Sequence, residues 1–222
     1  MRLFEAIVEA NHRALAGDAT AGLRPREFAT SLPAVVLTCF DPRMHPLMPE
    51  VLGLPETDFL WLTNAGNVVT GPLSSTVRSL ALACVVHGGR EIAIIGHNDC
   101  QFFRPAKYLL AERLGGLGFD GATAAGLLDE FLRRLVDEQS NVSLAARFVR
   151  QSPLIDREVP VHGLMADVET GRLEWVVNGY ETAYTTAPLP VFPPPSPGAP
   201  PPAPSIPTEF KIGGDLPPIG GG

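Results

Sequence analysis

Basic residues, cysteines and long apolar runs are all scarce in this chain of 222 residues. Lys and Arg together number 17 against 24 Asp and Glu, which gives a formal net charge of -7 and an isoelectric point near 5.2. Nucleic acids and anionic membrane surfaces bind clustered Lys and Arg, so this balance argues against both as partners. We therefore expect the chain to act on a small molecule or to bind another protein.

Two further absences concern the cellular compartment and covalent cross-linking. No run of about 18 apolar residues occurs, and Glu5 and Glu9 interrupt the apolar stretch where a signal peptide would continue. We expect a cytoplasmic protein without a membrane-spanning segment. Three cysteines cannot build a disulfide framework in a chain of this length, and an odd count beside other ligand-type residues indicates metal binding or catalysis.

Short apolar runs alternate with helical patterns along most of the chain. Three continuous apolar runs predict strands buried on both faces, at residues 34–38, 59–63 and 91–95. Two later strands are predicted at residues 161–167 and 173–177. Helical spacing predicts four helices, over residues 2–16, from the cap at Ser74 to the stop at Gly88, over 104–114 and over 122–150 with a break near Ser140 and Asn141. The predicted fold class is α/β, with a mostly parallel central sheet flanked by helices.

Proline dominates the C-terminal part of the chain. Residues 187–222 hold 13 of the 23 prolines, and such a segment favours extended polyproline geometry. We therefore predict a folded domain over residues 1–186 and an extended Pro/Gly-rich tail over residues 187–222. Apolar residues return near its end, which predicts a tether with a docking peptide for a protein partner, a shell or a neighbouring subunit. Plain disorder is the alternative.

Two of the cysteines and one histidine lie in the segments that follow predicted strands. Cys39 follows the first strand, and His97 and Cys100 follow the third. Parallel sheets place ligand sites beyond the carboxyl ends of their strands, where these side chains would lie. Two thiolates and one imidazole suit zinc, and three protein ligands leave a fourth position for water, as in catalytic sites. Taken alone, a His and a Cys near a strand end are more often packing residues.

A carboxylate and a guanidinium follow the first of these cysteines. In the segment Cys39–Arg43, Asp41 lies two residues after the cysteine and Arg43 two residues after Asp41. An arginine can donate two parallel hydrogen bonds to a carboxylate and so orient it. An ordinary surface ion pair is the alternative reading of this segment alone.

The two clusters together resemble the β-class carbonic anhydrases. That family carries Cys-x-Asp-Ser-Arg after its first core strand, a strand ending in Asn-Ala-Gly, and Gly-His-x-Asp-Cys-Gly after a later strand. This chain has Cys39–Arg43, Asn64–Gly66 and Gly96–Cys100 in the same order, and the resemblance covers about residues 30 to 180. Pro42 replaces the usual Ser and Gln101 the usual Gly, which leaves the substrate and the rate open.

The resemblance implies a zinc lyase that hydrates carbon dioxide to bicarbonate and a proton by a zinc-bound hydroxide. Cys39, His97 and Cys100 would hold the zinc. Asp41 would accept a hydrogen bond from the zinc-bound water, and Arg43 would keep Asp41 ionised and aimed. The family also implies a homodimer or a larger homo-oligomer.

Two other functions fit the same residues. Relatives on this fold hydrolyse carbonyl sulfide or carbon disulfide at the same zinc, and a zinc-stabilised scaffold without catalysis would also keep the ligands.

A proton must also leave the site, and His45 is the nearest candidate carrier in sequence, although a packed surface histidine is the alternative. Cys84 lies in an apolar helical stretch and is expected to be a small buried hydrophobic residue.

Overall fold

A five-stranded sheet forms the centre of the computed structural model, which describes residues 1–103 and 137–181 with isolated residues between them (112, 113, 115–118, 120, 123 and 126). The strands are β1 (Ala34–Cys39), β2 (Phe59–Asn64), β3 (Ile92–His97), β4 (Val161–Ala166) and β5 (Leu173–Val177). Their order is β2-β1-β3-β4-β5. The first four strands pair in parallel, and β5 pairs antiparallel with β4. The predicted α/β class with a mostly parallel sheet is confirmed.

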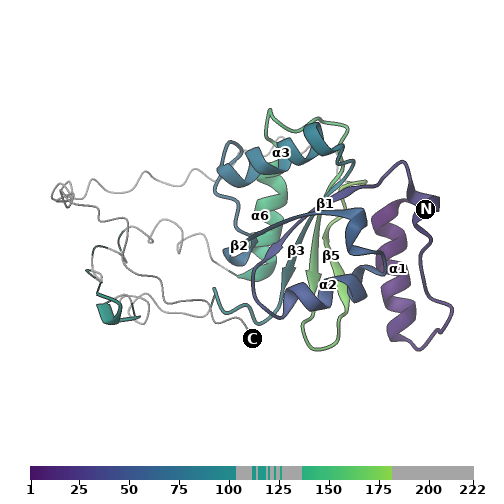
Figure 1. Cartoon of the computed structure of the whole chain (residues 1–222), viewed down its shortest axis with the longest axis horizontal. Coiled ribbons are helices and arrows are strands. Elements are labelled where there is room, and N and C mark those ends of the chain that lie inside the picture. Colours follow the sequence, from purple (N-terminus) through teal and green to yellow (C-terminus); the bar gives the residue numbers. More distant parts are fainter. Residues whose placement is uncertain are drawn as a thin grey trace, which may run out of the picture. The chain divides into compact units, whose positions relative to one another are not determined.

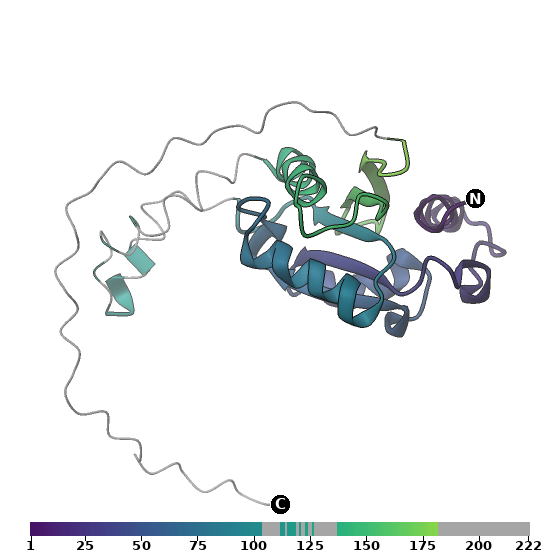
Figure 2. The same ribbon diagram turned by 90° about the horizontal axis from the view of Figure 1, so that it is seen from above.

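The described helices cover both faces of the sheet (Figures 1 and 2). They are α1 (Leu3–Leu15), α2 (Met44–Leu52), α3 (Ser75–His87) and α6 (Glu138–Arg150), with short 3-10 helices at Pro25–Phe28, Glu56–Asp58 and Ala65–Asn67. Side chains alternate along a strand, so Val36 packs with α1 and α2 on one face and Val35 packs with α3 and α6 on the other. None of these helices has the length and apolar character needed to cross a membrane.

Strands β1 and β3 are buried from end to end. Every residue of β1 and of β3 is inaccessible to solvent, whereas β2 at the edge of the sheet is mostly half-buried. This explains why the apolar runs for β1 and β3 are continuous rather than alternating. The five strands lie where the sequence places them, within two residues at each end.

The predicted helices α1 and α3 are found, whereas the start of α6 differs from the prediction. Ser74 caps α3 by accepting the N–H of Val77, and Gly88 ends it in a left-handed conformation, as predicted. The predicted break near Ser140 and Asn141 is displaced, because α6 continues through both residues and the extended backbone lies at Asp137. Asp137 caps α6 by accepting the N–H of Ser140 at 2.7 Å. Asp137 and Ser140 therefore lie at the start of this helix.

Other predictions fall on parts of the chain that the structure leaves undescribed. Most of the predicted helix over 104–114 and most of residues 122–136 lie outside the described residues, and so does the tail over 187–222. The helix α2 was not predicted. It contains Pro46 and Pro49, and proline usually marks the end of a helical pattern.

Helix α6 approaches the sheet closely at two glycines. A Cβ atom on Gly96 would lie 2.4 Å from Cγ2 of Val142 and 2.9 Å from Sδ of Met165. A Cβ atom on Gly163 would lie 2.9 Å from Cγ1 of the same valine. The missing side chains thus let α6 lie directly on β3 and β4, and this brings its first turn beside the residues that follow β3.

We predict that Gly96→Ala lowers the free energy of unfolding by about 1–3 kcal/mol, the usual cost of forcing extra atoms into a packed core. Val142 cannot readily turn away, because a β-branched side chain in a helix has one strongly preferred rotamer. Urea unfolding followed by circular dichroism measures the change. Gly22→Ala is the control, since a Cβ there meets no atom within 4 Å. Equal unfolding midpoints for the two variants would contradict the close approach.

Candidate metal centre

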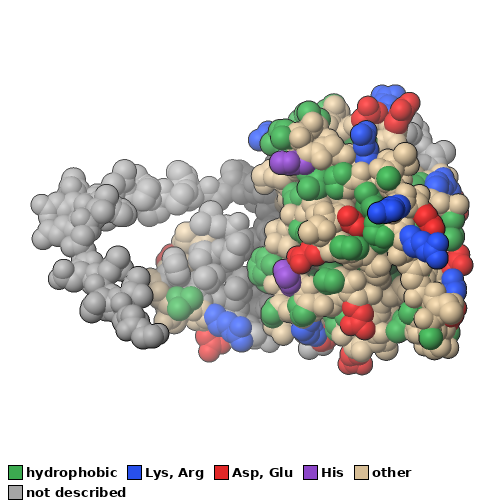
Figure 3. Space-filling model, turned by 45° about the vertical axis from the view of Figure 1, so that its right-hand side comes forward, with side chains coloured by type: hydrophobic (Ala, Val, Ile, Leu, Met, Phe, Trp, Pro, Cys, Tyr) green, Lys and Arg blue, Asp and Glu red, His purple; other side chains and the backbone are tan. Residues whose placement is uncertain are grey.

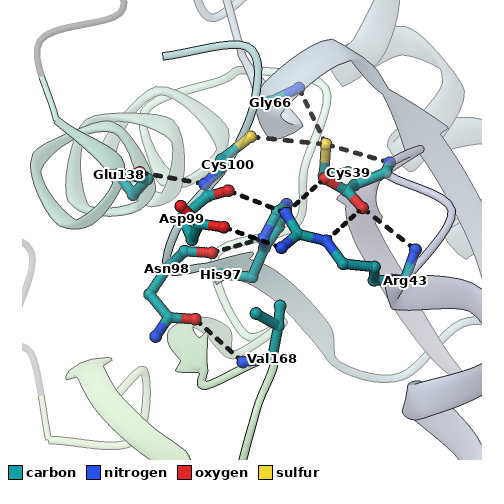
Figure 4. Close-up of polar contacts among 10 residues, drawn as sticks. Cys39, Arg43, Gly66, His97, Asn98, Asp99, Cys100, Glu138 and Val168 are labelled. Carbon is teal, nitrogen blue, oxygen red and sulfur yellow. Dashed lines mark hydrogen bonds and ion pairs between the residues drawn. The ribbon is translucent and has the colours of Figure 1, made fainter. Parts of the chain in front are cut away.

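The two cysteines and the histidine singled out in the sequence converge at one edge of the sheet (Figure 4). Cys39 ends β1 and His97 ends β3, and these strands are parallel neighbours. Cys100 follows three residues after His97. Their ligand-type atoms all lie within 4.8 Å of one another, and all three residues are buried. The chain leaves β1 toward β2 on one side, while β3 lies on the other, and such switch points are where open parallel sheets form binding sites.

The geometry of this cluster fits zinc. Tetrahedral zinc with Zn–S bonds of about 2.3 Å places two thiolates about 3.8 Å apart, and the Sγ atoms of Cys39 and Cys100 lie 3.9 Å apart. Nδ1 of His97 lies 2.9 Å from the carbonyl oxygen of Asn98. Nε2 of His97 is buried and has no hydrogen-bond partner of good geometry among the described residues. If Nδ1 donates to that carbonyl, Nε2 keeps the lone pair that a metal ligand needs.

Backbone groups stabilise the thiolate form of Cys39. Its Sγ accepts the N–H groups of Asp41 and Gly66, each at 3.3 Å. Together with the neighbouring thiol of Cys100, the strongest contributor, they lower the pKa of Cys39 to about 5. The same neighbour and burial raise the pKa of Cys100. Gly66 is held in turn by Asn141 of α6, whose Nδ2 donates to the Gly66 carbonyl at 2.8 Å.

Asp41 and Arg43 form the expected two-point ion pair. Nε and Nη2 of Arg43 each donate at 2.9 Å, to Oδ1 and Oδ2 of Asp41 respectively. The backbone N–H of Arg43 also donates to Oδ1, at 3.1 Å. Only 3% of Asp41 is exposed, yet the guanidinium lowers the pKa of its carboxyl to about 2. Asp41 is therefore ionised at any pH near neutrality and acts only as a hydrogen-bond acceptor.

Three polar residues around the cluster were not assigned a role from the sequence (Figure 4). Asp99 accepts hydrogen bonds from Arg43 through its carboxylate and its backbone carbonyl. Glu138, in the first turn of α6, accepts the N–H of Cys100 at 3.2 Å. Asn98 donates to Asp167 at 2.8 Å and accepts the N–H of Val168 at 2.9 Å. These hydrogen bonds fix the loop from His97 to Cys100 to Arg43, to helix α6 and to the turn between β4 and β5.

A small cavity of about 190 Å³ adjoins the cluster. Cys39 and Asp41 contribute to one part of its wall, and much of the rest is apolar, from Phe40, Pro42, Met48 and Trp61. His45 also lines the cavity, and its Nε2 lies 3.7 Å from Oε1 of Glu56. Pro42 and Gln101 are the two residues that differ from the family pattern. Pro42 lines this cavity, whereas Gln101 is exposed to solvent. Cys84, expected to be buried, is only partly buried on α3.

The surface carries charges of both signs. On the face shown in Figure 3, basic side chains lie among acidic ones instead of forming the continuous basic patch that nucleic acids bind. This distribution agrees with the overall excess of acidic residues.

Comparison with known sequences identifies several related proteins. The family model described as carbonic anhydrase matches residues 34–115, a span that includes the whole Cys/His/Cys cluster. YvdA of Bacillus subtilis, which carries the provisional name of a carbonic anhydrase, is 34% identical over 154 residues, covering 67% of this chain and 78% of that protein. A carbon disulfide hydrolase of Saccharolobus solfataricus is 30% identical over 156 residues, covering 62% and 74% of the two chains.

Comparison with solved structures agrees with the sequence comparison. The crystal structure of β-carbonic anhydrase isoform I from Trichomonas vaginalis superposes with a TM-score of 0.64 at 27% identity. The match covers 81% of this chain and all of the other. The sheet and its helices therefore follow the arrangement of that enzyme.

We predict that replacing Cys39, His97 or Cys100 by Ala removes bound zinc, because a site with three protein ligands cannot lose one and still fix the metal. Zinc content after dialysis, measured per chain by elemental analysis, tests each variant. The control is Cys84→Ala, which removes the third cysteine and should leave the zinc content unchanged. A ligand variant that retains stoichiometric zinc would be removed from the ligand set.

Proposed function

The chain belongs to the β-carbonic anhydrase family, and from this premise we propose that it catalyses the reversible hydration of carbon dioxide to bicarbonate and a proton at a zinc ion. The observation that carries the proposal is the ionised carboxylate of Asp41, held by Arg43 beside the Cys/His/Cys cluster. A purely structural zinc site has no use for such a carboxylate next to an open coordination position.

Cys39, His97 and Cys100 are the residues that would hold the zinc. When bound, zinc supplies Lewis acidity that lowers the pKa of a coordinated water molecule toward neutrality. The N–H groups of Asp41 and Gly66 stabilise negative charge on Cys39, which keeps it in the form that binds zinc. Asn98 and Glu138 hold the loop that carries the other two ligands.

Asp41 would orient the reacting water. Its Oδ2 takes a single hydrogen bond from the described residues, and a carboxylate oxygen has two lone pairs. One acceptor position therefore stays available for a water hydrogen. By accepting that hydrogen, Asp41 turns a lone pair of the water toward the carbon of the substrate. Arg43 prevents Asp41 from taking up a proton, since it lowers the pKa of the carboxyl to about 2.

The cavity beside the cluster suits a small uncharged substrate. Its apolar wall can accept carbon dioxide, which carries no charge and needs no counter-ion. The proton that each hydration releases must reach solvent, and we propose His45, in the wall of the same cavity, as its carrier.

Hydrolysis of carbon disulfide or carbonyl sulfide is the second candidate function. It is favoured by the similarity to the carbon disulfide hydrolase of Saccharolobus solfataricus. Zinc-loaded protein is assayed by stopped flow for carbon dioxide hydration and by sulfide release for the other two substrates. Hydration without sulfide release supports our proposal, and the reverse supports the second candidate. Full zinc occupancy without either activity would favour a non-catalytic scaffold.

We also propose that the enzyme is a cytoplasmic homodimer or larger homo-oligomer. Apolar side chains are exposed on the outer face of α3, at Leu82, Val85 and Val86. Burial of such a surface against a second subunit would stabilise the assembly.

We predict that Asp41→Ala keeps zinc but lowers kcat/KM for carbon dioxide by about 100-fold, a typical loss when a group that acts in the transition state is removed. Activity and zinc content are measured on the same sample. The matched control is Asp18→Ala, which removes another Arg-paired aspartate, far from the site in the sequence. Unchanged turnover in Asp41→Ala would show that this carboxylate has no catalytic role.

We further propose that residues 1–186 form the catalytic domain and that residues 187–222 form a tether with a docking peptide. Deletion of residues 188–222 should leave zinc content and hydration activity unchanged while abolishing any co-purifying partner or higher assembly. Size-exclusion chromatography and activity assays on the full and the shortened chain measure both effects. A collapse of activity would place the tail in the catalytic unit.

A further inference from the structure

We infer that Asp99 is a positioning residue that holds the Arg43 guanidinium against Asp41 and joins the two loops of the metal centre. The inference concerns both the geometry of the metal site and catalysis. Its catalytic part rests on the function proposed above, whereas its metal-binding part does not.

The guanidinium of Arg43 contacts two aspartates, Asp41 and Asp99, and Figure 4 shows its approach to Asp99. Its side edge, Nε and Nη2, donates to the carboxylate of Asp41. Its end, Nη1 and Nη2, donates to Asp99, at 2.9 Å to the carboxylate Oδ2 and at 2.8 Å to the backbone carbonyl. All three guanidinium nitrogens therefore donate, and rotation of the side chain would break contacts with both aspartates at once.

The backbone of Asp99 contributes to this arrangement. Its φ is +55°, in the left-handed region that Asn, Asp and Gly tolerate better than other residues. This conformation lets the carboxylate and the carbonyl of the same residue meet one guanidinium. Asp99 directly precedes Cys100, so a shift of its backbone is transmitted to a proposed zinc ligand.

The contact links segments that are far apart in the sequence. Arg43 belongs to the loop after Cys39, and Asp99 belongs to the loop that carries His97 and Cys100. Asn98 and Glu138 fix the second loop to the turn after β4 and to α6. The Arg43–Asp99 contact instead fixes it to the first loop, and so it helps to set the distance between the two sulfur atoms.

The effect of Asp99 is mainly geometric rather than electrostatic. The side chains of Arg43 and Asp99 are 35% and 37% exposed, so solvent screens their attraction. A neutral side chain that still accepts the hydrogen bond should therefore replace Asp99 well. A side chain without an acceptor should not, even where the backbone conformation is preserved.

The comparison of Asp99→Asn with Asp99→Gly tests this, because both residues tolerate a positive φ and only Asn keeps the acceptor. Zinc affinity is measured by chelator competition, the site geometry by the absorption bands of the cobalt-substituted protein, and kcat/KM by carbon dioxide hydration. We expect Asp99→Asn to stay within about threefold of the unmodified chain. Asp99→Gly should lose about tenfold in zinc affinity and in kcat/KM, a typical loss when a residue that orients metal ligands is removed. Its cobalt spectrum should change as well.

A double-mutant cycle separates positioning from a general loss of structure. If Asp99 acts through Arg43, Asp99→Gly should have no further effect on kcat/KM or on the cobalt spectrum in an Arg43→Ala background. Fully additive effects would overturn the inference. Asp18→Gly is the control, and it should leave zinc affinity and the cobalt spectrum unchanged.

Other outcomes are equally decisive. Asp99→Gly with unchanged zinc affinity and an unchanged cobalt spectrum would overturn the inference even if Arg43→Ala does not fold. Absence of hydration activity in the zinc-loaded, unmodified chain would refute the proposed function instead. The affinity and cobalt measurements would then still decide the role of Asp99.

Discussion

The parallel pairing of β1 with β3 brings together Cys39 and His97, two of the proposed metal ligands. In this register Thr38 is opposite Ile95, so the chain leaves both strands at the same edge of the sheet. Cys39 and His97 are the last residues of these strands, and they meet without any long loop. Both strands are fully buried, and shifting one of them would expose apolar side chains to water. The position of two proposed ligands is therefore stabilised by the same burial that stabilises the fold.

Helix α6 connects the packing of the sheet to the polar groups around the metal centre. Gly96 and Gly163 leave room for Val142, and the close approach of α6 that follows brings Asn141 to the carbonyl of Gly66 and Glu138 to the N–H of Cys100. The turn at Gly66 then donates its N–H to Cys39. A packing change at these glycines is therefore expected to disturb the site as well as the stability.

The sequence predicted those elements whose structure depends on residues close together in the chain. The strands appear as apolar runs, and Cys39 and His97 lie at the ends of two of them, so the clustering of these two residues could be expected from the sequence. Helix α2 could not, because the stop signals of Pro46 and Pro49 hide a helix that packing stabilises. The break near Ser140 was misplaced because a capped helix start and an interruption use the same polar residues. Arg43 and Asp99 are 56 positions apart in the sequence. No pattern in the neighbouring residues predicts their contact.

Metal binding and substrate selection involve different parts of the fold, and this bears on the choice between carbon dioxide and carbon disulfide. Both substrates are small, linear and uncharged, and the proposed ligands and the Asp41–Arg43 pair would serve either one. The cavity wall is built largely from other residues: Phe40 after β1, Met48 on α2 and Trp61 on β2. Sulfur is larger than oxygen, so the two substrates differ in size. The volume of this cavity, about 190 Å³, can therefore favour one substrate, whereas the metal site cannot. Selectivity should therefore change with substitutions at the apolar wall that leave the ligands and their hydrogen bonds intact.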